Sequence, residues 1–417
     1  MTSVDHTGLN GTAQVPEPAR RESPAHRIAS DAEALSVARA LAAEFREEAA
    51  ARDRERRLPF AEIQRFSQSG LWGITVPKAY GGAGVSNGTL AEVVATISAA
   101  DASIGQIPQN HYYMVEAIRL DASEEQKRFY FQQVLDGDRF GNALSEIGTK
   151  RHTAFITRIA PAADGQGYIL DGQKFYSTGV LFAHWIAAVA HDDEKRGVIV
   201  LLRRDAAGLT LVDDWTGFGQ RTTGSGTTRF TSIRVGEFAL VPHWKAFARP
   251  TPMGAVAQLL HAAVDLGIAR AAFADALEFV RTKSRPWIDS GADQATDDPL
   301  TRVKFGELQV RLRAAESLVQ RAARFVDAAQ ADPGAGHSEA ASIAVAEAKV
   351  LTTEVSLQAG STLFELAGAG ATAAKYGLDR HWRNARTHTI HDPIRWKYHA
   401  IGNYFLNGID PPRHGAL

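Results

Sequence analysis

The spacing of apolar residues changes twice along the chain and divides it into three regions. From Ser30 to about Gly137 the apolar residues recur at helical spacing, and the segments 90–100 and 123–137 show this clearly. The first stripe consists of Ala34, Leu35, Ala38, Leu41 and Phe45. Ser30 stands just before this stripe, where its hydroxyl can accept a free backbone N–H at a helix start. This region is predicted to be a helical domain.

The second region, from about Asp138 to Lys245, consists of short β-rich runs separated by glycine-rich turns. These runs are 153–179, 197–205, 208–214 and 227–235. Short runs at this spacing are typical of antiparallel strands joined by tight turns. The region is predicted to be a compact, barrel-like antiparallel β domain.

From about Pro250 the helical spacing returns in long amphipathic segments. They cover 258–283, 307–329 and 341–368, and a last helix begins near Asp379, which predicts an antiparallel four-helix bundle. The weakly charged stretch from Met253 to Val280 is long enough to span a membrane. Its interruption by five ionisable residues favours a buried helix instead. Those five are His261, Asp265, Arg270, Asp275 and Glu278.

These patterns divide the chain into four predicted parts. Residues 1–26 are polar and rich in Pro and Gly, which is typical of a mobile tail. The N-terminal helical domain covers 27–137, the β domain 138–246 and the C-terminal bundle 247–417. The start of the chain lacks the apolar segment of a signal peptide, so a cytoplasmic protein is expected.

Composition excludes several classes of function. Lys and Arg total 46 against 47 Asp and Glu, so the net charge is −1, and no nucleic-acid partner is expected. The chain has no cysteine, which excludes disulfides, thiolate nucleophiles and Cys-ligated metal centres. Gly368–Ala373 matches G-x-G-x-x-A, but a helical pattern rather than a strand precedes it. A glycine-rich helix C-cap therefore explains this motif better than a dinucleotide site.

The densest cluster of candidate chemistry lies between Arg386 and Gly408. His388 and His391 are predicted to share one face of a helix, with His381 nearby. Three imidazoles can bind zinc, but no Cys or suitably spaced Glu completes a ligand set, so no metal is expected. The stretch is then either a packed helix or the imidazole-lined wall of a cofactor or substrate pocket.

Four segments together resemble the acyl-CoA dehydrogenases over about residues 30–410. They are "LWGITVPKAYGGAG" (71–84), "FGNALSE" (140–146), "LDGQKFYSTG" (170–179) and "FGQRTTGSGTTRFTSIRV" (218–235). The resemblance implies a mostly α fold with a central antiparallel β domain and a C-terminal four-helix bundle. It also implies a homotetramer.

The chain departs from that family where its chemistry resides. His391 stands near the position of the family's catalytic Glu, and "RTKSRPW" (281–287) and "ELAGAGA" (365–371) replace elements that hold the adenylate of FAD. These features resemble the flavin monooxygenase branch, which includes dibenzothiophene and methanesulfinate monooxygenases and sulfur-acquisition oxidoreductases. The resemblance implies FMN, supplied as FMNH2 by a separate reductase, and O2 as co-substrate.

The implied reaction is oxygenation of a small organosulfur compound through a C4a-hydroperoxyflavin. An acyl-CoA dehydrogenase-type FAD desaturase is the alternative, and a non-catalytic flavin-binding relative is a third reading. The expected catalytic residues are His111, Ser177 and His391, and the expected substrate pocket contains His111, Tyr112 and His388. The expected flavin contacts are Asn142, Ser145, Ser177, Thr178, Trp215, Arg281, Arg285 and His391. Four of these residues have a purely structural alternative: Ser177 as a turn serine, Trp215 as a core residue, and Arg281 and Arg285 as partners in surface salt bridges.

Overall fold

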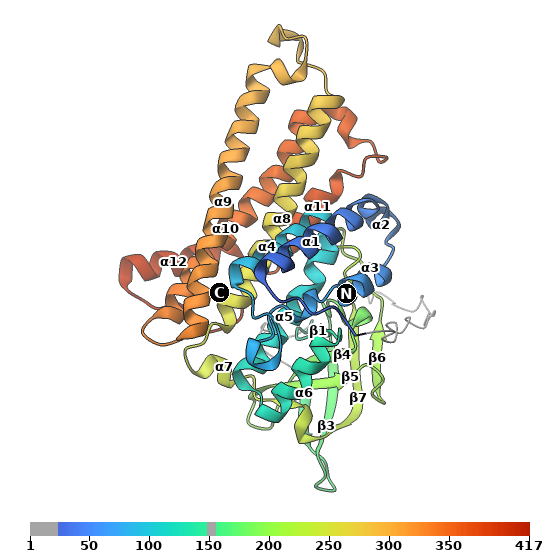
Figure 1. Ribbon diagram of the computed structural model, residues 1–417, viewed down its shortest axis with the longest axis vertical. Coiled ribbons are helices and arrows are strands. Elements are labelled where there is room, and N and C mark those ends of the chain that lie inside the picture. Colours follow the sequence, from blue (N-terminus) through green and yellow to red (C-terminus); the bar gives the residue numbers. More distant parts are fainter. Residues whose placement is uncertain (1–23, 148–155) are drawn as a thin grey trace, which may run out of the picture.

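A computed structural model describes residues 24–147 and 156–417. The predicted mobile tail, 1–26, lies almost wholly outside the described residues. Figure 1 shows the N-terminal helices and the sheet in the lower part of the molecule, with the long helices of the bundle extending upwards from them.

The N-terminal region is helical as predicted. Its helices are α1 (Asp31–Arg46), α2 (Ala49–Glu55), α3 (Phe60–Gln68), α4 (Asn87–Ala100), α5 (Ala102–Asp121) and α6 (Glu124–Leu135). Ser30 caps α1 by accepting the backbone N–H of Glu33, as its position in the sequence indicated. At the start of α6, Ser123 and Gln126 form a reciprocal capping box.

The second region forms one sheet of eight strands. They are β1 (Phe140–Ala143), β2 (Arg158–Pro161), β3 (Tyr168–Lys174), β4 (Trp185–His191), β5 (Gly197–Arg203), β6 (Leu209–Val212), β7 (Thr227–Val235) and β8 (Leu240–Val241). The order is β6-β7-β3-β2-β4-β5-β8, with β1 beside β4. The sheet is mostly antiparallel, as predicted, but β4 pairs parallel with both β1 and β2. Between β3 and β4 the chain passes through the short turn Val180–Phe182, and β4 then runs parallel to β1.

The C-terminal region begins with the short helix α7 (Lys245–Ala248) and continues as long helices. They are α8 (Met253–Thr282), α9 (Pro299–Ala331), α10 (His337–Ala367), α11 (Asp379–Thr389) and α12 (Ile394–Asn407). We predicted one continuous last helix, and this prediction was wrong. The segment forms two helices, α11 and α12, with the break just before Pro393, because proline restricts the preceding residue and has no N–H to donate. Gly368 ends α10 with a φ of 76°, which confirms the predicted glycine C-cap.

Helix α8 is the centre of the fold. Among the described helices it alone is long and apolar enough to cross a membrane, and 89% of its most apolar window is buried inside the protein. A Cβ added to Gly267 of α8 would lie 2.6 Å from Cβ of Ser98 in α4, and one added to Gly105 of α5 would lie 2.6 Å from Cα of Ser98. These glycines let three helices approach closely, as expected of a buried core helix.

Candidate functional site

A buried serine marks the first wall of the candidate site. After β3 the chain turns through Tyr176, whose φ is +56°, and Ser177 follows, with its backbone N–H bonded to the carbonyl of Gly226 at 3.1 Å. The Ser177 side chain is fully buried, yet its hydroxyl has no hydrogen-bond partner among the described residues. Buried polar groups are nearly always bonded in folded proteins, so this hydroxyl is available to a ligand.

The end of β1 packs against this turn. The backbone N–H of Asn142 donates to the carbonyl of Thr178 at 3.0 Å, and its side-chain amide donates to the carbonyl of Tyr176 at 3.3 Å. The carbonyl of Ser145 accepts the N–H of Phe175 at 3.0 Å. The structure therefore brings Asn142, Ser145, Ser177 and Thr178 together, as one would expect if they shared a site.

A buried ion pair holds the segment that follows β1. Lys174, at the end of β3, donates to Glu146 at 2.7 Å, and both side chains are almost completely buried. Burial lowers the pKa of Lys174 to about 8. Burial alone would raise the pKa of Glu146, but the hydrogen bonds from Lys174 and from the N–H of Ile156 lower it. The pair keeps the walls formed by β1 and β3 in register.

A loop between β6 and β7 forms the second wall and contacts α11. The N–H of Gln220 donates to the side chain of Asn384 at 2.7 Å, and the Trp215 indole donates to the carbonyl of Gln220 at 2.8 Å. A Cβ on Gly219 would lie 2.6 Å from Oγ1 of Thr387, so this approach requires glycine. The Gln220 amide and the Thr387 hydroxyl are buried without partners among the described residues.

Half-exposed aromatic rings border these unpaired groups. Tyr176, Phe218 and Trp382 are 47%, 50% and 39% exposed. The ring of Tyr176 lies 6.1 Å from that of Trp215, and Phe218 stacks on Trp382 at 6.1 Å. Aromatic walls with a few convergent polar groups are typical of sites for planar ring ligands.

His388 and His391, the two histidines that we predicted to lie on the last helix, have different surroundings. Because α11 ends at Thr389, His388 and His391 do not share a helix face, and that expectation was wrong. His388 is fully buried and contacts Asp265, so it offers no open surface to a substrate. The His391 side chain is 47% exposed and lies 3.3 Å from Asp392. Its ring is tilted by 39° against the ring of His261, with 4.1 Å between the ring centroids.

His261, His391 and Asp392 also form a candidate metal cluster. Their possible ligand atoms lie within 4.8 Å of one another. Zinc at about 2.1 Å from tetrahedral ligands separates those ligands by only about 3.4 Å. The 4.8 Å limit exceeds this separation, so it does not by itself define a zinc site.

His111 and Tyr112 lie in the interior of α5. His111 donates from Nε2 to the carbonyl of Trp72 at 2.9 Å and accepts at Nδ1 from the N–H of Phe140 at 3.1 Å. The Tyr112 hydroxyl donates to the carbonyl of Leu71 at 2.9 Å. Both ring nitrogens and the hydroxyl are occupied by backbone groups, and both side chains are buried, which favours a packing role over contact with substrate.

Arg281 and Arg285 lie at the opposite end of α8. Ala271 of α8 borders the same hollow as Asn384, and Arg281 is ten residues, about 15 Å of helix, beyond it. Both arginines are exposed, and their neighbour Ser284 bonds to the carbonyl of Ala367 at the far end of α10. Within one chain the structure does not bring them to the Ser177 wall.

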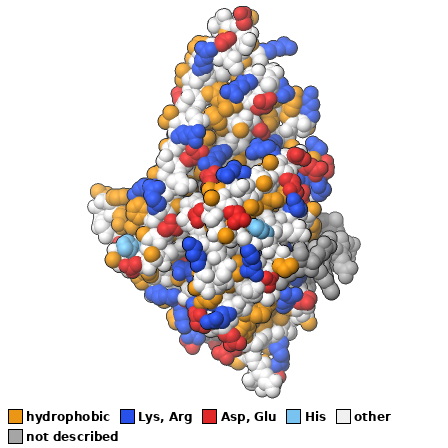
Figure 2. Space-filling view, viewed as in Figure 1, with side chains coloured by type: hydrophobic (Ala, Val, Ile, Leu, Met, Phe, Trp, Pro, Cys, Tyr) orange, Lys and Arg blue, Asp and Glu red, His pale blue; other side chains and the backbone are white. Residues whose placement is uncertain are grey.

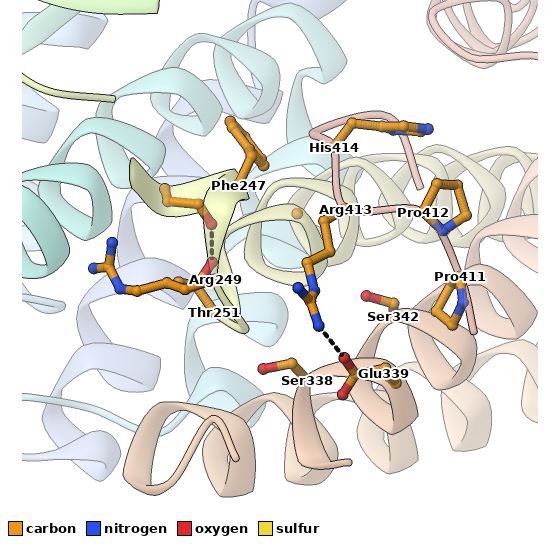
Figure 3. Close-up of a pocket in the computed structure, with 12 residues that line it drawn as sticks. Phe247, Arg249, Thr251, Ser338, Glu339, Ser342, Pro411, Pro412, Arg413 and His414 are labelled. Carbon is orange, nitrogen blue, oxygen red and sulfur yellow. Dashed lines mark hydrogen bonds and ion pairs between the residues drawn. The ribbon is translucent and has the colours of Figure 1, made fainter. Parts of the chain in front are cut away.

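A separate hollow lies where the C-terminal segment meets α7 and α10 (Figure 3). Arg413 bonds to Glu339 across it, and the Thr251 hydroxyl donates to the carbonyl of Ala246. Next to it, Gln258 and Lys397 bond to the carbonyls of Gly415 and Ala416. These contacts dock the C-terminal segment against α8 and α12.

Comparison with known proteins gives consistent matches. Residues 31–138 match the family described as acyl-CoA dehydrogenase, N-terminal domain, and residues 259–396 match acyl-CoA dehydrogenase, C-terminal domain. The chain is 35% identical over 404 residues to dibenzothiophene monooxygenase of Rhodococcus erythropolis, covering 92% of this chain and 96% of the relative. It is 34% identical to the probable FMNH2-dependent monooxygenase SfnC of Pseudomonas putida, covering 91% and 96%. The structure of FMN-bound TdsC from Paenibacillus sp. A11-2 superposes with a TM-score of 0.88 at 33% identity, covering 92% of this chain and 100% of TdsC.

Fold and site define a flavoprotein of the acyl-CoA dehydrogenase type. The chain belongs to that family and, within it, to the flavin monooxygenases related to dibenzothiophene monooxygenase. The family and fold class predicted from the sequence are confirmed. The roles of individual site residues stay predictions.

Sequence reasoning missed several residues of the candidate site. Gln220 and Phe218 lie inside a segment recognised for its resemblance, but no role was expected for either. Asn384 and Thr387 lie in a basic helix in which a role was expected only for the histidines. His261 and Asp265 were noted only as interruptions of an apolar helix, although two polar residues four apart in such a helix were a usable signal.

Replacing His111 tests whether it is a buried neutral histidine. Burial lowers its pKa to about 3, so between pH 6.5 and about 4 the unfolded chain binds one more proton there than the folded protein. Stability should therefore fall by about 1.4 kcal/mol per pH unit on acidification because of this residue. In His111→Gln that contribution to the slope should disappear, as measured by urea unfolding at several pH values. An unchanged slope would show that His111 is not held neutral.

Proposed function

We propose that this protein binds FMN and uses FMNH2 and O2 to oxygenate a small organosulfur compound. One observation carries the proposal. The side-chain polar atoms of Ser177, Gln220 and Thr387 are buried and have no hydrogen-bond partner in the described part of the chain, and half-exposed aromatic rings lie beside them. A flavin presents both a planar ring system and a polar edge, so this set fits it. The names of the relatives support FMN, its reduced form and a sulfur-containing substrate.

Reduced flavin, when bound, supplies the reaction with O2, and the protein supplies binding and protection. The Ser177 hydroxyl and the Gln220 amide can bond to the polar edge of the ring. Tyr176 and Trp215, whose rings lie 6.1 Å apart, would lie against the ring and limit its contact with water. His391, with its ring half exposed beside Asp392, can give or take a proton at the pocket.

We further infer a two-component system in the cytoplasm. The sequence offers no nicotinamide-binding fingerprint in a strand–turn–helix context, so a separate reductase is needed to supply FMNH2. Side chains of both charges are interspersed over the face shown in Figure 2, which fits small-molecule chemistry better than a polyanion partner.

A homotetramer fits two further features. Apolar side chains gather over α12, at the left of Figure 2, where Trp396, Phe405 and Leu406 are 60%, 67% and 84% exposed. Exposed apolar patches of this kind mark protein interfaces. Arg281 and Arg285 are too far along α8 to join the Ser177 wall of their own chain, so in our proposal they reach the FMN phosphate of a second subunit. Arg forks match phosphate oxygens well.

The direct test supplies the purified protein with FMNH2 under anaerobic conditions and then adds O2. We expect FMNH2 to bind more tightly than FAD or oxidised FMN. A panel of dibenzothiophene, methanesulfinate, dimethyl sulfide and its sulfone should contain a substrate that gains one oxygen atom, detected by mass spectrometry with ¹⁸O2. A clear preference for FAD and no oxygen incorporation would contradict the proposal.

Ser177→Ala tests the unpaired hydroxyl. A buried hydrogen bond is worth about 1–3 kcal/mol, and each ~1.4 kcal/mol is tenfold in rate. If the hydroxyl stabilises the state that precedes oxygen transfer, release of hydrogen peroxide should accelerate by about 10- to 100-fold while FMNH2 affinity changes far less. Stopped-flow absorbance and peroxide yield measure this. The exposed Ser361→Ala in α10 is the matched control, and equal behaviour of both variants would reduce Ser177 to a turn residue.

Co-expression tests where the phosphate arginines act. A chain carrying Ser177→Ala and a chain carrying Arg281→Ala with Arg285→Ala should each be nearly inactive. If the arginines serve a second subunit, mixed oligomers contain some intact sites and recover about a quarter of the parent activity. If they serve their own chain, every site keeps one defect and activity stays low. Light scattering should report a tetramer, and a monomer at micromolar concentration would contradict the arrangement.

A further inference from the structure

Three buried hydroxyl groups form a continuous chain between the two walls of the candidate site. The hydroxyl oxygen of Thr178, on the turn after β3, lies 2.7 Å from that of Ser225. The hydroxyl oxygen of Ser225 lies 2.7 Å from that of Thr223, whose hydroxyl contacts the carbonyl of Gln220 at 3.0 Å. All four residues are at most 6% exposed, so water does not compete for these bonds.

The direction of each hydrogen bond follows from the carbonyl end of this chain. A carbonyl oxygen can only accept, and that of Gln220 accepts both the Trp215 indole N–H and the Thr223 hydroxyl. If Thr223 donated to Ser225 instead, two oxygen atoms would face each other at 3.0 Å with no proton between them. Ser225 must therefore donate to Thr223, and Thr178 must donate to Ser225. Each hydroxyl carries one proton, so Thr178 can only accept a hydrogen bond from a ligand.

Backbone hydrogen bonds fix the two segments that carry these hydroxyl groups. The N–H of Ser177 donates to the carbonyl of Gly226 at 3.1 Å, and the N–H of Gly179 donates to the carbonyl of Thr223 at 3.2 Å. Both backbone polar groups of Thr178 are bonded within the protein as well. Its hydroxyl oxygen is therefore the polar atom of Thr178 that remains for a ligand. It follows directly after Ser177, whose buried hydroxyl has no partner among the described residues.

A hydroxyl that accepts but cannot donate distinguishes the two redox forms of a flavin. Oxidised FMN presents a bare nitrogen at ring position N5, and reduction adds a proton there. A fixed acceptor gains a hydrogen bond from that new N–H, whereas it meets only another acceptor in the oxidised ring. A hydroxyl that rotates freely would serve both forms, because it could donate to the bare nitrogen.

We propose that Thr178, Ser225 and Thr223 form an oriented hydroxyl chain that makes the site selective for reduced FMN. Thr178 accepts the ring N–H that reduction adds. Ser225 and Thr223 are positioning residues, which keep the proton of Thr178 turned away from the ligand. The inference rests on the proposed function, because it requires FMN to bind at the Ser177 wall. It gives a two-component oxygenase a means of taking up FMNH2 and releasing oxidised FMN after turnover.

Two variants break the hydroxyl chain and leave Thr178 in place. Ser225→Ala removes the acceptor of the Thr178 proton, which can then turn towards the ligand. Thr223→Val removes the acceptor of the Ser225 proton, so Ser225 can reverse and donate to Thr178, which again frees the Thr178 proton. Thr223→Ser keeps the hydroxyl and should behave as the parent does.

Helix α10 offers a matched control. Thr352 is fully buried, and its hydroxyl donates to the carbonyl of Lys349, three residues earlier, at 3.2 Å. Thr223 makes the same kind of contact with Gln220, which also lies three residues earlier. Thr352→Val therefore removes the same kind of hydrogen bond from a buried threonine outside the hydroxyl chain.

The measurement is the ratio of the dissociation constant of oxidised FMN to that of FMNH2, each titrated into the protein without oxygen. The ratio should fall by about tenfold in Ser225→Ala and in Thr223→Val, because the freed hydroxyl can bond to both forms. It should keep the parent value in Thr223→Ser and in Thr352→Val. The reduction potential of bound FMN reports the same ratio independently, and a tenfold fall lowers it by about 30 mV for this two-electron couple.

An unchanged ratio in Ser225→Ala or in Thr223→Val would overturn the inference, as would an equal fall in Thr352→Val. If Thr223→Val does not fold, as judged by thermal unfolding, Ser225→Ala alone decides. Neutron diffraction of the protein without flavin tests the orientation directly. It should place the hydroxyl deuterium of Thr178 between Thr178 and Ser225, and a deuterium directed away from Ser225 would contradict the chain.

The outcomes also separate this inference from the proposed function. If the ratio falls as expected in the chain variants while the parent oxygenates no substrate, the proposed function fails and the hydroxyl chain stands. If the parent oxygenates a substrate while the chain variants keep its ratio, only the hydroxyl chain fails. A parent that binds neither form of FMN would overturn both.

Discussion

The bundle depends on one buried charge. Asp265 lies in the middle of α8 with no exposed side-chain surface, and an unpaired carboxylate there would cost on the order of several kcal/mol. Lys349 and Thr353 from α10 and His388 from α11 satisfy it. These bonds fix the rotation of α8 against α10 and bring α11 onto the same side. The polar centre of the bundle and one wall of the candidate site are therefore a single arrangement.

The second wall is joined to the first through α11. Asn384 holds the β6–β7 loop by accepting the N–H of Gln220, and Thr387 lies close against Gly219. His388 follows Thr387 directly and is buried. A movement of α11 would change the loop around the ring-binding wall and the position of His388 together. Helix α11 thus joins the β6–β7 loop to the buried histidines of the bundle, and Gln220 and His388 lie more than a hundred residues apart in sequence.

Residue type and spacing along the chain predicted the features that depend on neighbouring residues, such as helix caps and buried helices. The Ser30 cap, the buried helix from Met253 and the Gly368 C-cap all followed from residue type and spacing. The recognised segments led to the expectation that Asn142, Ser145, Ser177 and Thr178 contact one flavin. The proline at 393 indicates a helix break, but the prediction from the sequence did not include one. The parallel pairing of β1 with β4 and the contact of Asp265 with Lys349 depend on long-range packing, which no local pattern specifies. Long-range packing also determines how far the Arg281 end of α8 lies from Ser177, so this distance could not be predicted from the sequence.

The position of His391 explains how one fold supports different chemistry. In the acyl-CoA dehydrogenases that this chain resembles, a glutamate near this point removes a proton, and an ionised carboxylate can only accept. Here Pro393 ends the regular helix early, and His391 occupies the resulting turn with Asp392 beside it and His261 beneath it. An imidazole can both give and take a proton near neutral pH, which is the role proposed here for His391. In this proposal a change at one helix end gives the site a different acid–base group, while the layers of the fold are kept.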